Sequence, residues 1–277
     1  MSLYNVVGNP VEHSKSPYIH QLFAAQTGED LEYRAVKVEA DSFDNFVKEF
    51  FIDKGAGLNI TVPFKEAAYR LAERHGEHAA LARSVNTLYL DDAGTLCGEN
   101  TDGIGLIRDI QDNNGFSIRK KRVLLLGAGG AARGALSELI NHQPSSIVLL
   151  NRTLSKAQQL KEEFGGLAEV ESFCYENFSA TGFDLIINAT SLSLSGELPP
   201  LNRNALQPGC CCYDMMYGVE ATVFVRWAKG NGIALALDGL GMLVEQAAES
   251  FSIWRGKRPD TGPVISILRE QPENEIS

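Results

Sequence analysis

Short hydrophobic runs alternate with amphipathic stretches in the first part of the chain. Between two of the runs, Phe43, Phe46, Val47 and Phe50 recur at helical spacing. The runs are rich in β-branched and aromatic residues, as is typical of strands, and they cover residues 5–7, 33–38, 58–62 and 85–90. Strands that alternate with helices predict an α/β layer.

A second series of runs is more apolar and nearly continuous, and it covers residues 123–126, 147–150, 185–187, 211–213 and 234–237. Runs of this kind are typical of parallel strands that helices cover on both faces. The stretch from Gly103 to Gly115 predicts a connecting helix, and we place the change of domain there. After Gly239, apolar residues at helical spacing predict a late helix.

Composition limits the class of protein. The chain has 277 residues, which is enough for two domains. It holds 35 acidic and 25 basic residues, and this balance argues against a nucleic-acid surface. No apolar run approaches the ~20 residues that span a bilayer, and the N-terminus lacks the pattern of a signal peptide. We therefore expect a cytoplasmic protein without nucleic-acid or membrane partners.

Cysteine and histidine residues do not predict a metal site. The five cysteines include no Cys-x-x-Cys pair, and we expect the run at 210–212 to lie in a buried strand. A reactive thiol in that run is the alternative. His75 and His78 are three positions apart and are expected to share a solvated helix face, because the alternative, a metal site, lacks a third ligand nearby.

One hydrophobic run leads directly into a glycine-rich turn. Residues 127–132 follow the pattern G-x-G-x-x-A between a predicted strand and a predicted helix. Gly127 permits the tight turn, Gly129 lets a pyrophosphate approach the backbone, and Ala132 lets the helix pack closely. Because a helix N-terminus favours an anion, we expect a dinucleotide site here. A tight turn without a ligand is the alternative.

The end of the following strand predicts which dinucleotide binds. It reads Asn151-Arg152-Thr153, where NAD-binding domains usually carry an acidic residue that holds the ribose hydroxyls. A guanidinium suits a 2′-phosphate, and Lys156 adds positive charge one turn later. NADP is therefore expected rather than NAD. The alternative is that Arg152 is a solvated turn residue.

Polar residues gather at predicted strand ends in the first part of the chain, at 14–17, 59–65, 84–87 and 99–103. Open α/β sheets bind ligands at the carboxyl ends of their strands. Pro63 is expected to end a strand, so that Lys65 falls in the first turn of a helix and projects into the ligand crevice. An exposed lysine at a helix start is the alternative.

Together these motifs resemble the shikimate dehydrogenase family over almost the whole chain. The segments that carry the resemblance are 9–10, 14–17, 59–65, 86–87, 100–103, 127–133, 151–153, 188–191, 213–217 and 238–246. The resemblance implies an oxidoreductase that uses NADP to interconvert 3-dehydroshikimate and shikimate, in chorismate and aromatic amino-acid biosynthesis. It also implies an N-terminal α/β substrate domain (1–103, completed by C-terminal helices at 241–277), a Rossmann-type doubly wound NADP-binding domain (104–240), and a cleft between them.

The resemblance also implies roles for individual residues. Lys65 and Asp102 are expected to form the catalytic acid–base pair. The residues expected to contact the substrate are Ser14, Ser16, Thr61, Lys65, Asn86, Asp102, Tyr217 and Gln246. The residues expected to contact the cofactor are Glu77, Gly127, Ala128, Gly129, Gly130, Ala131, Asn151, Arg152, Thr153, Lys156, Thr190, Met215, Gly239 and Met242. For Met215, a place in the hydrophobic core is the alternative.

Two other functions stay open at this point. One is a quinate/shikimate dehydrogenase with broader use of substrates or cofactors. The other is an NADPH-binding sensor without turnover, although such a protein need not retain Lys65 together with Asp102. No metal is expected, the partner is a small-molecule substrate, and the chain is expected to be a monomer or a homodimer.

Overall fold

The chain divides into two compact units in the computed structural model, which describes residues 1–270. Unit 1 comprises residues 1–105 and the chain from Val244 onward, and unit 2 comprises residues 106–243. Residues 271–277 of the predicted segment 241–277 lie outside the described residues. Within the described part of the chain, no helix combines the length and the apolar character needed to cross a membrane.

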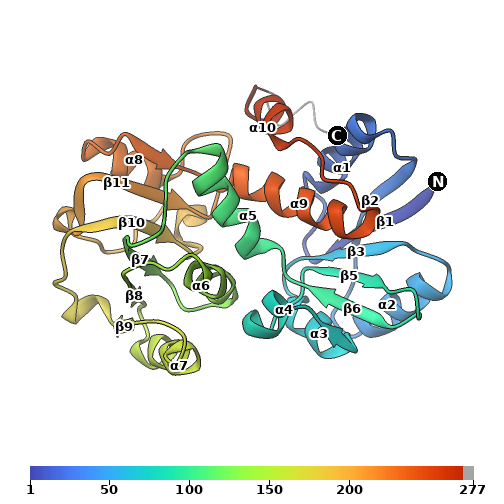
Figure 1. Cartoon of the computed structure of the whole chain (residues 1–277), viewed down its shortest axis with the longest axis horizontal. Helices are drawn as coiled ribbons and strands as arrows, with labels where there is room; N and C mark the ends of the chain where they lie inside the picture. The colour runs from blue at the N-terminus through green and yellow to red at the C-terminus, as the bar shows by residue number, and fades with distance from the viewer. Residues whose placement is uncertain (271–277) are drawn as a thin grey trace. The chain divides into compact units, whose positions relative to one another are not determined.

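Unit 1 contains a six-stranded mixed sheet in the order β2-β1-β3-β5-β6-β4, of which Figure 1 labels the first five strands. Its strands are β1 (Ser2–Gly8), β2 (Leu31–Lys37), β3 (Gly57–Ile60), β4 (Arg74–His75), β5 (Thr87–Leu90) and β6 (Leu96–Glu99). β1 pairs in parallel with β2 and β3, whereas β5 runs antiparallel to β3 and β6. This confirms the predicted α/β layer.

The helices of unit 1 are α1 (Ser16–Thr27), α2 (Phe43–Ile52), α3 (Lys65–Leu71), α4 (Glu77–Ala82) and α10 (Thr261–Glu270). Two further helices, α5 (Asp102–Arg108) and α9 (Leu240–Arg255), begin in one unit and end in the other. The predicted spacing in α2 is confirmed for Phe43, Val47 and Phe50, which are buried, while Phe46 packs against their cluster from a half-buried position.

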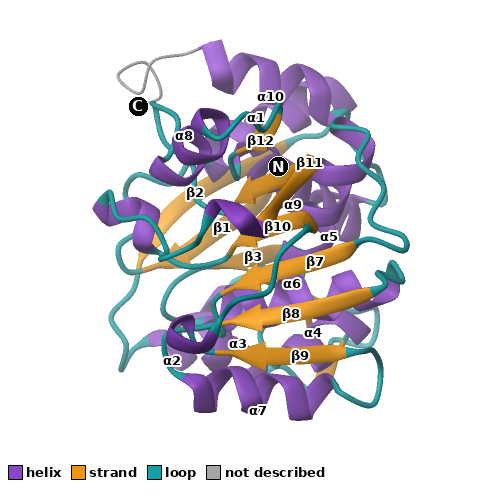
Figure 2. Cartoon of the chain, turned by 90° about the vertical axis from the view of Figure 1, so that its left-hand side faces the viewer, coloured by secondary structure: helices purple, strands orange, loops and turns teal. Residues whose placement is uncertain are grey.

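Unit 2 contains six parallel strands in the order β12-β11-β10-β7-β8-β9. They are β7 (Arg122–Leu126), β8 (Ser146–Leu150), β9 (Val170–Phe173), β10 (Phe183–Asn188), β11 (Leu206–Asp214) and β12 (Leu235–Leu237). The chain starts at β7, moves outward to β8 and β9, then returns to the other side of β7, as Figure 2 shows for β10, β7, β8 and β9. This is the doubly wound order of dinucleotide-binding domains, with its switch point between β7 and β10.

The helices of unit 2 are α6 (Gly130–Asn141), α7 (Leu154–Phe164) and α8 (Val223–Gly230), with short turns η1 (Asp109–Asn113), η2 (Tyr175–Asn177), η3 (Leu192–Ser195) and η4 (Arg203–Ala205). The predicted continuous strands are confirmed. Leu124 and Leu126 of β7, Val148 of β8 and Ile186 of β10 share one buried cluster.

The structure decides two predictions about cysteine and histidine. The run at 210–212 is buried in β11, and burial raises the pKa of Cys211 to about 12, so its thiol stays protonated near neutral pH. The prediction that His75 and His78 share a helix face is wrong, because His75 belongs to β4 and only His78 belongs to α4. The His75 ring packs on Tyr69 and its Nε2 contacts the Tyr69 main-chain oxygen at 2.7 Å.

Candidate active site

A lysine and an aspartate from two helix starts form an ion pair in unit 1. Lys65 is the first residue of α3, as predicted, although β3 already ends at Ile60 and not at Pro63. Asp102 is the first residue of α5. Nζ of Lys65 lies 2.5 Å from Oδ2 of Asp102, and the two side chains are 29% and 17% exposed. A small ligand can therefore reach a charge-assisted pair that is already largely withdrawn from water.

Asn86 holds the other oxygen of the same carboxylate. Its Nδ2 donates to Oδ1 of Asp102 at 2.9 Å, and its Oδ1 accepts from the main-chain N–H of Thr101 at 2.9 Å. The main-chain N–H of Asp102 donates to the side chain of Asn100 at 3.1 Å. The carboxylate is thus fixed by a different partner at each oxygen, which leaves Oδ2 directed at Lys65.

Two serine hydroxyls lie at the start of α1. Ser16 is the first residue of that helix and is buried, and its main-chain N–H donates to Oγ of Ser14 at 3.3 Å. The Ser16 hydroxyl also interacts with Tyr33, whose pKa is raised well above its usual value by burial, with the Ser16 hydrogen bond opposing. Short hydroxyls at a helix N-terminus are suitable donors for a carboxylate.

The remaining predicted substrate contacts lie in three places. Thr61 is half-buried between β3 and α3, and its methyl group occupies the space beside Gly8, where a Cβ would lie 2.4 Å away. Gln246 lies on α9, and its main-chain oxygen accepts from Oγ1 of Thr101 at 3.0 Å. Tyr217 follows β11 and belongs to unit 2, unlike the other members of the set.

The glycine-rich turn connects β7 to α6 in unit 2. Gly127 has φ +109°, a conformation that favours glycine, and its N–H donates to the Leu150 oxygen at 2.8 Å. A Cβ on Gly129 or Gly130 would meet no atom within 4 Å, so the backbone at the start of α6 faces open space. Ala132 is fully buried, which allows close packing of the helix. The turn therefore fits the pyrophosphate of a dinucleotide.

Two cations lie exposed where β8 ends. Arg152 and Lys156 are both exposed, and Thr153 is the residue before α7. Nδ2 of Asn151 donates to the Thr153 main-chain oxygen at 2.9 Å, which shapes this turn. The Arg152 charge also reaches Tyr175, whose pKa is raised to about 12 chiefly by burial. Exposed cations at this strand end fit a 2′-phosphate.

A buried carboxylate organises the loops after β10 and β11. Oδ2 of Asp214 accepts from the hydroxyls of Ser193 (2.6 Å) and Thr222 (2.7 Å), and Oδ1 accepts from Nδ2 of Asn188 at 3.1 Å. Burial raises the pKa of Asp214 and these donors oppose the effect. Oδ1 of Asn188 in turn accepts from the hydroxyl of Thr190 at 2.7 Å. The predicted cofactor contact Thr190 is therefore held in place from behind.

Met215 and Gly239 lie against each other in unit 2. Met215 is buried, and a Cβ on Gly239 would lie 2.2 Å from the Met215 main-chain oxygen. The close approach that requires glycine at 239 is therefore to the protein's own backbone. Met242 is half-buried on α9, and Glu77 is an exposed residue at the start of α4 in unit 1.

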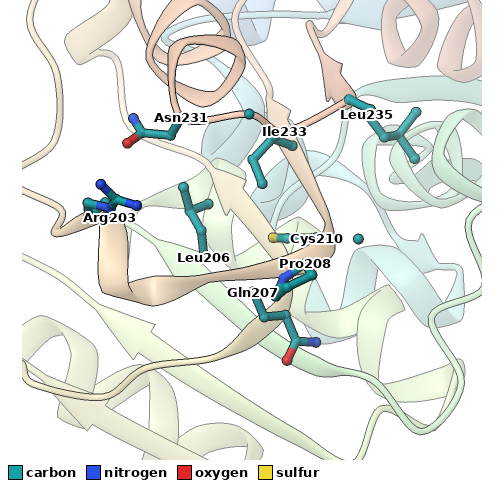
Figure 3. A pocket seen from close by; sticks show the side chains of 11 residues that line it. Arg203, Leu206, Gln207, Pro208, Cys210, Asn231, Ile233 and Leu235 are labelled. Carbon is teal, nitrogen blue, oxygen red and sulfur yellow. The ribbon is translucent and has the colours of Figure 1, made fainter.

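A pocket of about 460 Å³ lies elsewhere in unit 2 (Figure 3). It is lined by residues at the start of β11, among them Leu206 and Cys210, and by the turn before β12 with Asn231 and Ile233. The glycine-rich turn follows the end of β7, at the carboxyl ends of the parallel strands. The pocket lies at the amino ends of the strands, on the opposite side of the sheet from this turn. It contains none of the predicted site residues.

Several polar residues that support the site escape the motif-based prediction. Thr87, Thr101 and Ser250 are fully buried, and Asn59 is nearly so. Three of these lie inside the polar clusters at predicted strand ends, which was the available signal. Ser250 lies in the late helix three positions after Ala247 and four before Trp254, so a polar residue on the apolar face was the signal there.

Three family models match successive parts of the chain. They are the shikimate dehydrogenase substrate binding domain at residues 6–88, shikimate / quinate 5-dehydrogenase at residues 109–195, and the shikimate 5′-dehydrogenase C-terminal domain at residues 239–269. Each of the two units thus contains a match from this family.

Curated relatives match over nearly their whole length. A shikimate dehydrogenase (NADP(+)) from Cellvibrio japonicus is 52% identical over 97% of this chain and 97% of its own. The enzyme of the same name from Alkalilimnicola ehrlichii is 51% identical over 97% of this chain and 98% of its own.

Solved structures share the fold over the same extent. An Ael1 enzyme from Pseudomonas putida has a TM-score of 0.93 at 46% identity, covering 98% of this chain and 99% of its own. The shikimate 5-dehydrogenase of Thermus thermophilus, solved in complex with NADP(H) and shikimate, has a TM-score of 0.86 at 30% identity, covering 97% and 99%. With half of its residues identical to those of full-length relatives, the chain belongs to the shikimate dehydrogenase family.

Proposed function

We propose that the chain catalyses the reversible reduction of 3-dehydroshikimate to shikimate with NADPH, a step of aromatic amino-acid biosynthesis. The observation that carries this proposal is the Lys65–Asp102 pair, 2.5 Å apart and fixed by Asn86. An ammonium held in this way can give a proton to a ketone oxygen, and general acid–base groups of this kind contribute about 100- to 10,000-fold to a rate.

Lys65 is the proposed acid in the reductive direction. NADPH, when bound, supplies the hydride that reaches the carbonyl carbon. Nζ of Lys65 donates its proton to the ketone oxygen, which becomes the hydroxyl of shikimate, and Nζ then regains a proton from solvent. In the reverse direction neutral Lys65 accepts the hydroxyl proton. Asp102 holds Nζ in place and accepts a hydrogen bond from a ring hydroxyl.

The substrate is proposed to bind through its carboxylate and its ring hydroxyls. Ser14 and Ser16 donate to the carboxylate from the start of α1. The proposed ring contacts are Thr61, Asn86, Asp102, Tyr217 and Gln246. Binding by neutral hydroxyls suits the burial of Ser16, because no unpaired charge is left buried in the free protein.

NADP is proposed to bind to unit 2. The residues that would hold it are Gly127, Ala128, Gly129, Gly130, Ala131, Asn151, Arg152, Thr153, Lys156, Thr190, Met215, Gly239 and Met242. The open backbone at Gly129 and the exposed Arg152 support this proposal. Glu77 stays a prediction, since nothing in its surroundings points to a cofactor contact. The five cysteines are free thiols, which suits a reducing compartment, and we propose a cytoplasmic location.

A second candidate is a dehydrogenase that also uses quinate, because the family model matching residues 109–195 covers both activities by its name. The shikimate-specific enzyme and the enzyme that also uses quinate differ in whether they accept one added ring hydroxyl. A polar pocket discriminates only weakly on the basis of one such group. Whether the chain prefers shikimate is therefore a quantitative matter of relative kcat/KM.

The proposal is tested by shikimate-dependent formation of NADPH from NADP+, with Asp102→Asn as the matched variant. Asn keeps the shape of the side chain but removes the negative charge that pairs with Lys65. We expect turnover by the wild type and at least a ~100-fold lower kcat in the variant. A wild-type protein that binds NADPH, as shown by fluorescence titration, yet gives no turnover contradicts the proposal and supports the sensor.

A further inference from the structure

A connected group of hydroxyl and amide side chains lies behind the Lys65–Asp102 pair in unit 1. Its members are Tyr33, Asn59, Ser250, Thr87, Thr101 and Asn86. Tyr33 is half-buried and the other five are buried, and they come from strands β2, β3 and β5, the segments just before β5 and α5, and helix α9. A network that joins so many elements is suited to holding one side chain in a single orientation.

Main-chain groups fix the orientation of both amides. Oδ1 of Asn86 accepts from the N–H of Thr101 at 2.9 Å, and Nδ2 of Asn59 donates to the main-chain oxygen of Asn86 at 3.1 Å. A backbone N–H only donates and a backbone carbonyl only accepts, so neither amide can be reversed without losing that bond. The Asn59 oxygen then accepts from the Tyr33 hydroxyl at 2.7 Å.

The hydroxyls of Thr87 and Ser250 connect the two amides. Oγ1 of Thr87 lies 2.9 Å from Oδ1 of Asn86, which only accepts, so Thr87 donates there. Ser250 lies 2.7 Å from Thr87, and either hydroxyl can be the donor in that contact, because Ser250 can also donate to the Gln246 main-chain oxygen at 3.1 Å. Ser250 then accepts from Nδ2 of Asn59 at 3.0 Å. Thr87 thus contacts Asn86 directly, and Ser250 contacts Thr87 and Asn59.

The chain of hydrogen bonds ends at the acid–base pair. With its Oδ1 held by Thr87 and Thr101, Asn86 presents one N–H to the Thr101 hydroxyl at 2.9 Å and the other to Oδ1 of Asp102 at 2.9 Å. That second bond leaves Oδ2 of Asp102 for Lys65. The Asn86 amide that holds Asp102 is therefore bonded to the Thr87 hydroxyl, which itself contacts neither Asp102 nor Lys65.

We propose that Thr87 and Ser250 are positioning residues, which hold the Asn86 amide so that Asp102 stays directed at Lys65. The proposal rests on the proposed function, because it requires Lys65 to act on the substrate. A slight loss of alignment of a reacting group lowers the reaction rate strongly, and a misplacement of about 1 Å lowers it by up to about 100-fold. The two hydroxyls should therefore affect kcat rather than the binding of NADP.

The test compares Thr87→Val with Thr87→Ser in the full-length chain. Valine keeps the branched shape and removes the hydroxyl, whereas serine keeps the hydroxyl and removes the methyl group. We expect Thr87→Val to lower kcat about tenfold with the KM for NADP within about twofold of wild type, and Thr87→Ser to retain at least about half of the wild-type kcat. This rescue distinguishes positioning from simple loss of packing.

Ser250→Ala provides a second variant in case valine at 87 prevents folding. Its matched control is Ser137→Ala, since Ser137 is another buried helical serine, and its hydroxyl donates to the Gly134 carbonyl of its own helix at 2.8 Å. We expect Ser250→Ala to lower kcat at least about threefold and Ser137→Ala to change it less than about twofold.

The outcomes separate this proposal from the proposed function. Folding is checked by circular dichroism, and the integrity of unit 2 is checked by NADPH titration. Thr87→Val and Ser250→Ala with wild-type kcat, or a Thr87→Ser variant as slow as Thr87→Val, overturns the positioning role. No turnover by the wild type overturns the proposed function itself.

Discussion

Nζ of Lys65 and Oδ2 of Asp102 are 2.5 Å apart, although 37 positions separate them in the chain. Both residues begin helices, and both follow strands of the same sheet. Their proximity is thus a consequence of how unit 1 folds, and substitution of either residue tests the proposed acid–base chemistry.

Lys65→Ala removes the proposed proton donor. We expect kcat to fall at least ~100-fold with a smaller change in the KM for shikimate, because a proton-transfer group acts mainly in the transition state. Lys48→Ala, a change at an exposed lysine of α2 in the same unit, is the control and should be neutral. Near-normal turnover of Lys65→Ala in steady-state assays removes Lys65 from the chemistry.

Arg152→Ala tests recognition of the 2′-phosphate. An exposed guanidinium at the end of β8 favours the phosphate of NADP and offers nothing comparable to the hydroxyl of NAD. The KM for NADP should rise at least ~10-fold, and the KM for NAD should change little. The matched control is Arg203→Ala, because Arg203 lines the pocket in Figure 3, away from the end of β8. Equal effects on both cofactors are incompatible with this role.

Two glycine substitutions should separate cofactor binding from stability. Gly129→Ala places a Cβ in open space at the N-cap of α6, where alanine is less favourable than glycine, so the free energy of unfolding should fall by less than about 1 kcal/mol while the KM for NADP rises. Gly239→Ala places a Cβ 2.2 Å from the Met215 carbonyl and should cost about 1–3 kcal/mol of stability. Urea unfolding and steady-state kinetics measure the two effects, and the reverse pattern contradicts both assignments.

We expect His20 to make the stability of the fold depend on pH. Burial among Phe23, Tyr33 and Phe251 lowers its pKa to about 3, from an ordinary value of 6.5. Between these values the unfolded chain binds the proton and the folded chain does not, so stability falls as the pH drops below 6.5. The expected loss from this group is about 2 kcal/mol between pH 7 and pH 5.

Urea unfolding at both pH values measures this loss. His20→Phe keeps an aromatic ring against Tyr33 but cannot be protonated, and it should remove about 2 kcal/mol of the pH dependence. His13→Ala, at an exposed histidine, should leave the pH dependence as it is in the wild type. An unchanged pH dependence in His20→Phe shows that the buried imidazole does not cause it.

The buried strands of unit 2 were the most predictable part of the fold, because β7, β8 and β10 are apolar along most of their length. β9 was missed, since an exposed Glu171 interrupts its short apolar pattern, and the two-residue β4 has no pattern to detect. The histidine prediction failed because a strand ends between His75 and His78. Local spacing cannot show that a helix starts only after the first histidine.

For the site, the motifs predicted the candidate catalytic and binding residues but not the hydrogen bonds that hold their side chains in place. Lys65, Asn86 and Asp102 lie in separate polar clusters, and only the fold brings their side chains into hydrogen-bond contact. Ser250 is 163 positions from Thr87 in the chain and reaches Asn86 through it. Support of this kind depends on tertiary packing, so no local pattern specifies it.

The central claim is tested most directly by initial rates of the wild-type protein with shikimate or quinate and with NADP or NAD. We predict a kcat/KM for shikimate with NADP that exceeds each other combination at least ~10-fold, the factor that corresponds to about 1.4 kcal/mol. Comparable values with quinate or NAD would contradict a dedicated NADP-dependent shikimate dehydrogenase and favour the enzyme of broader specificity.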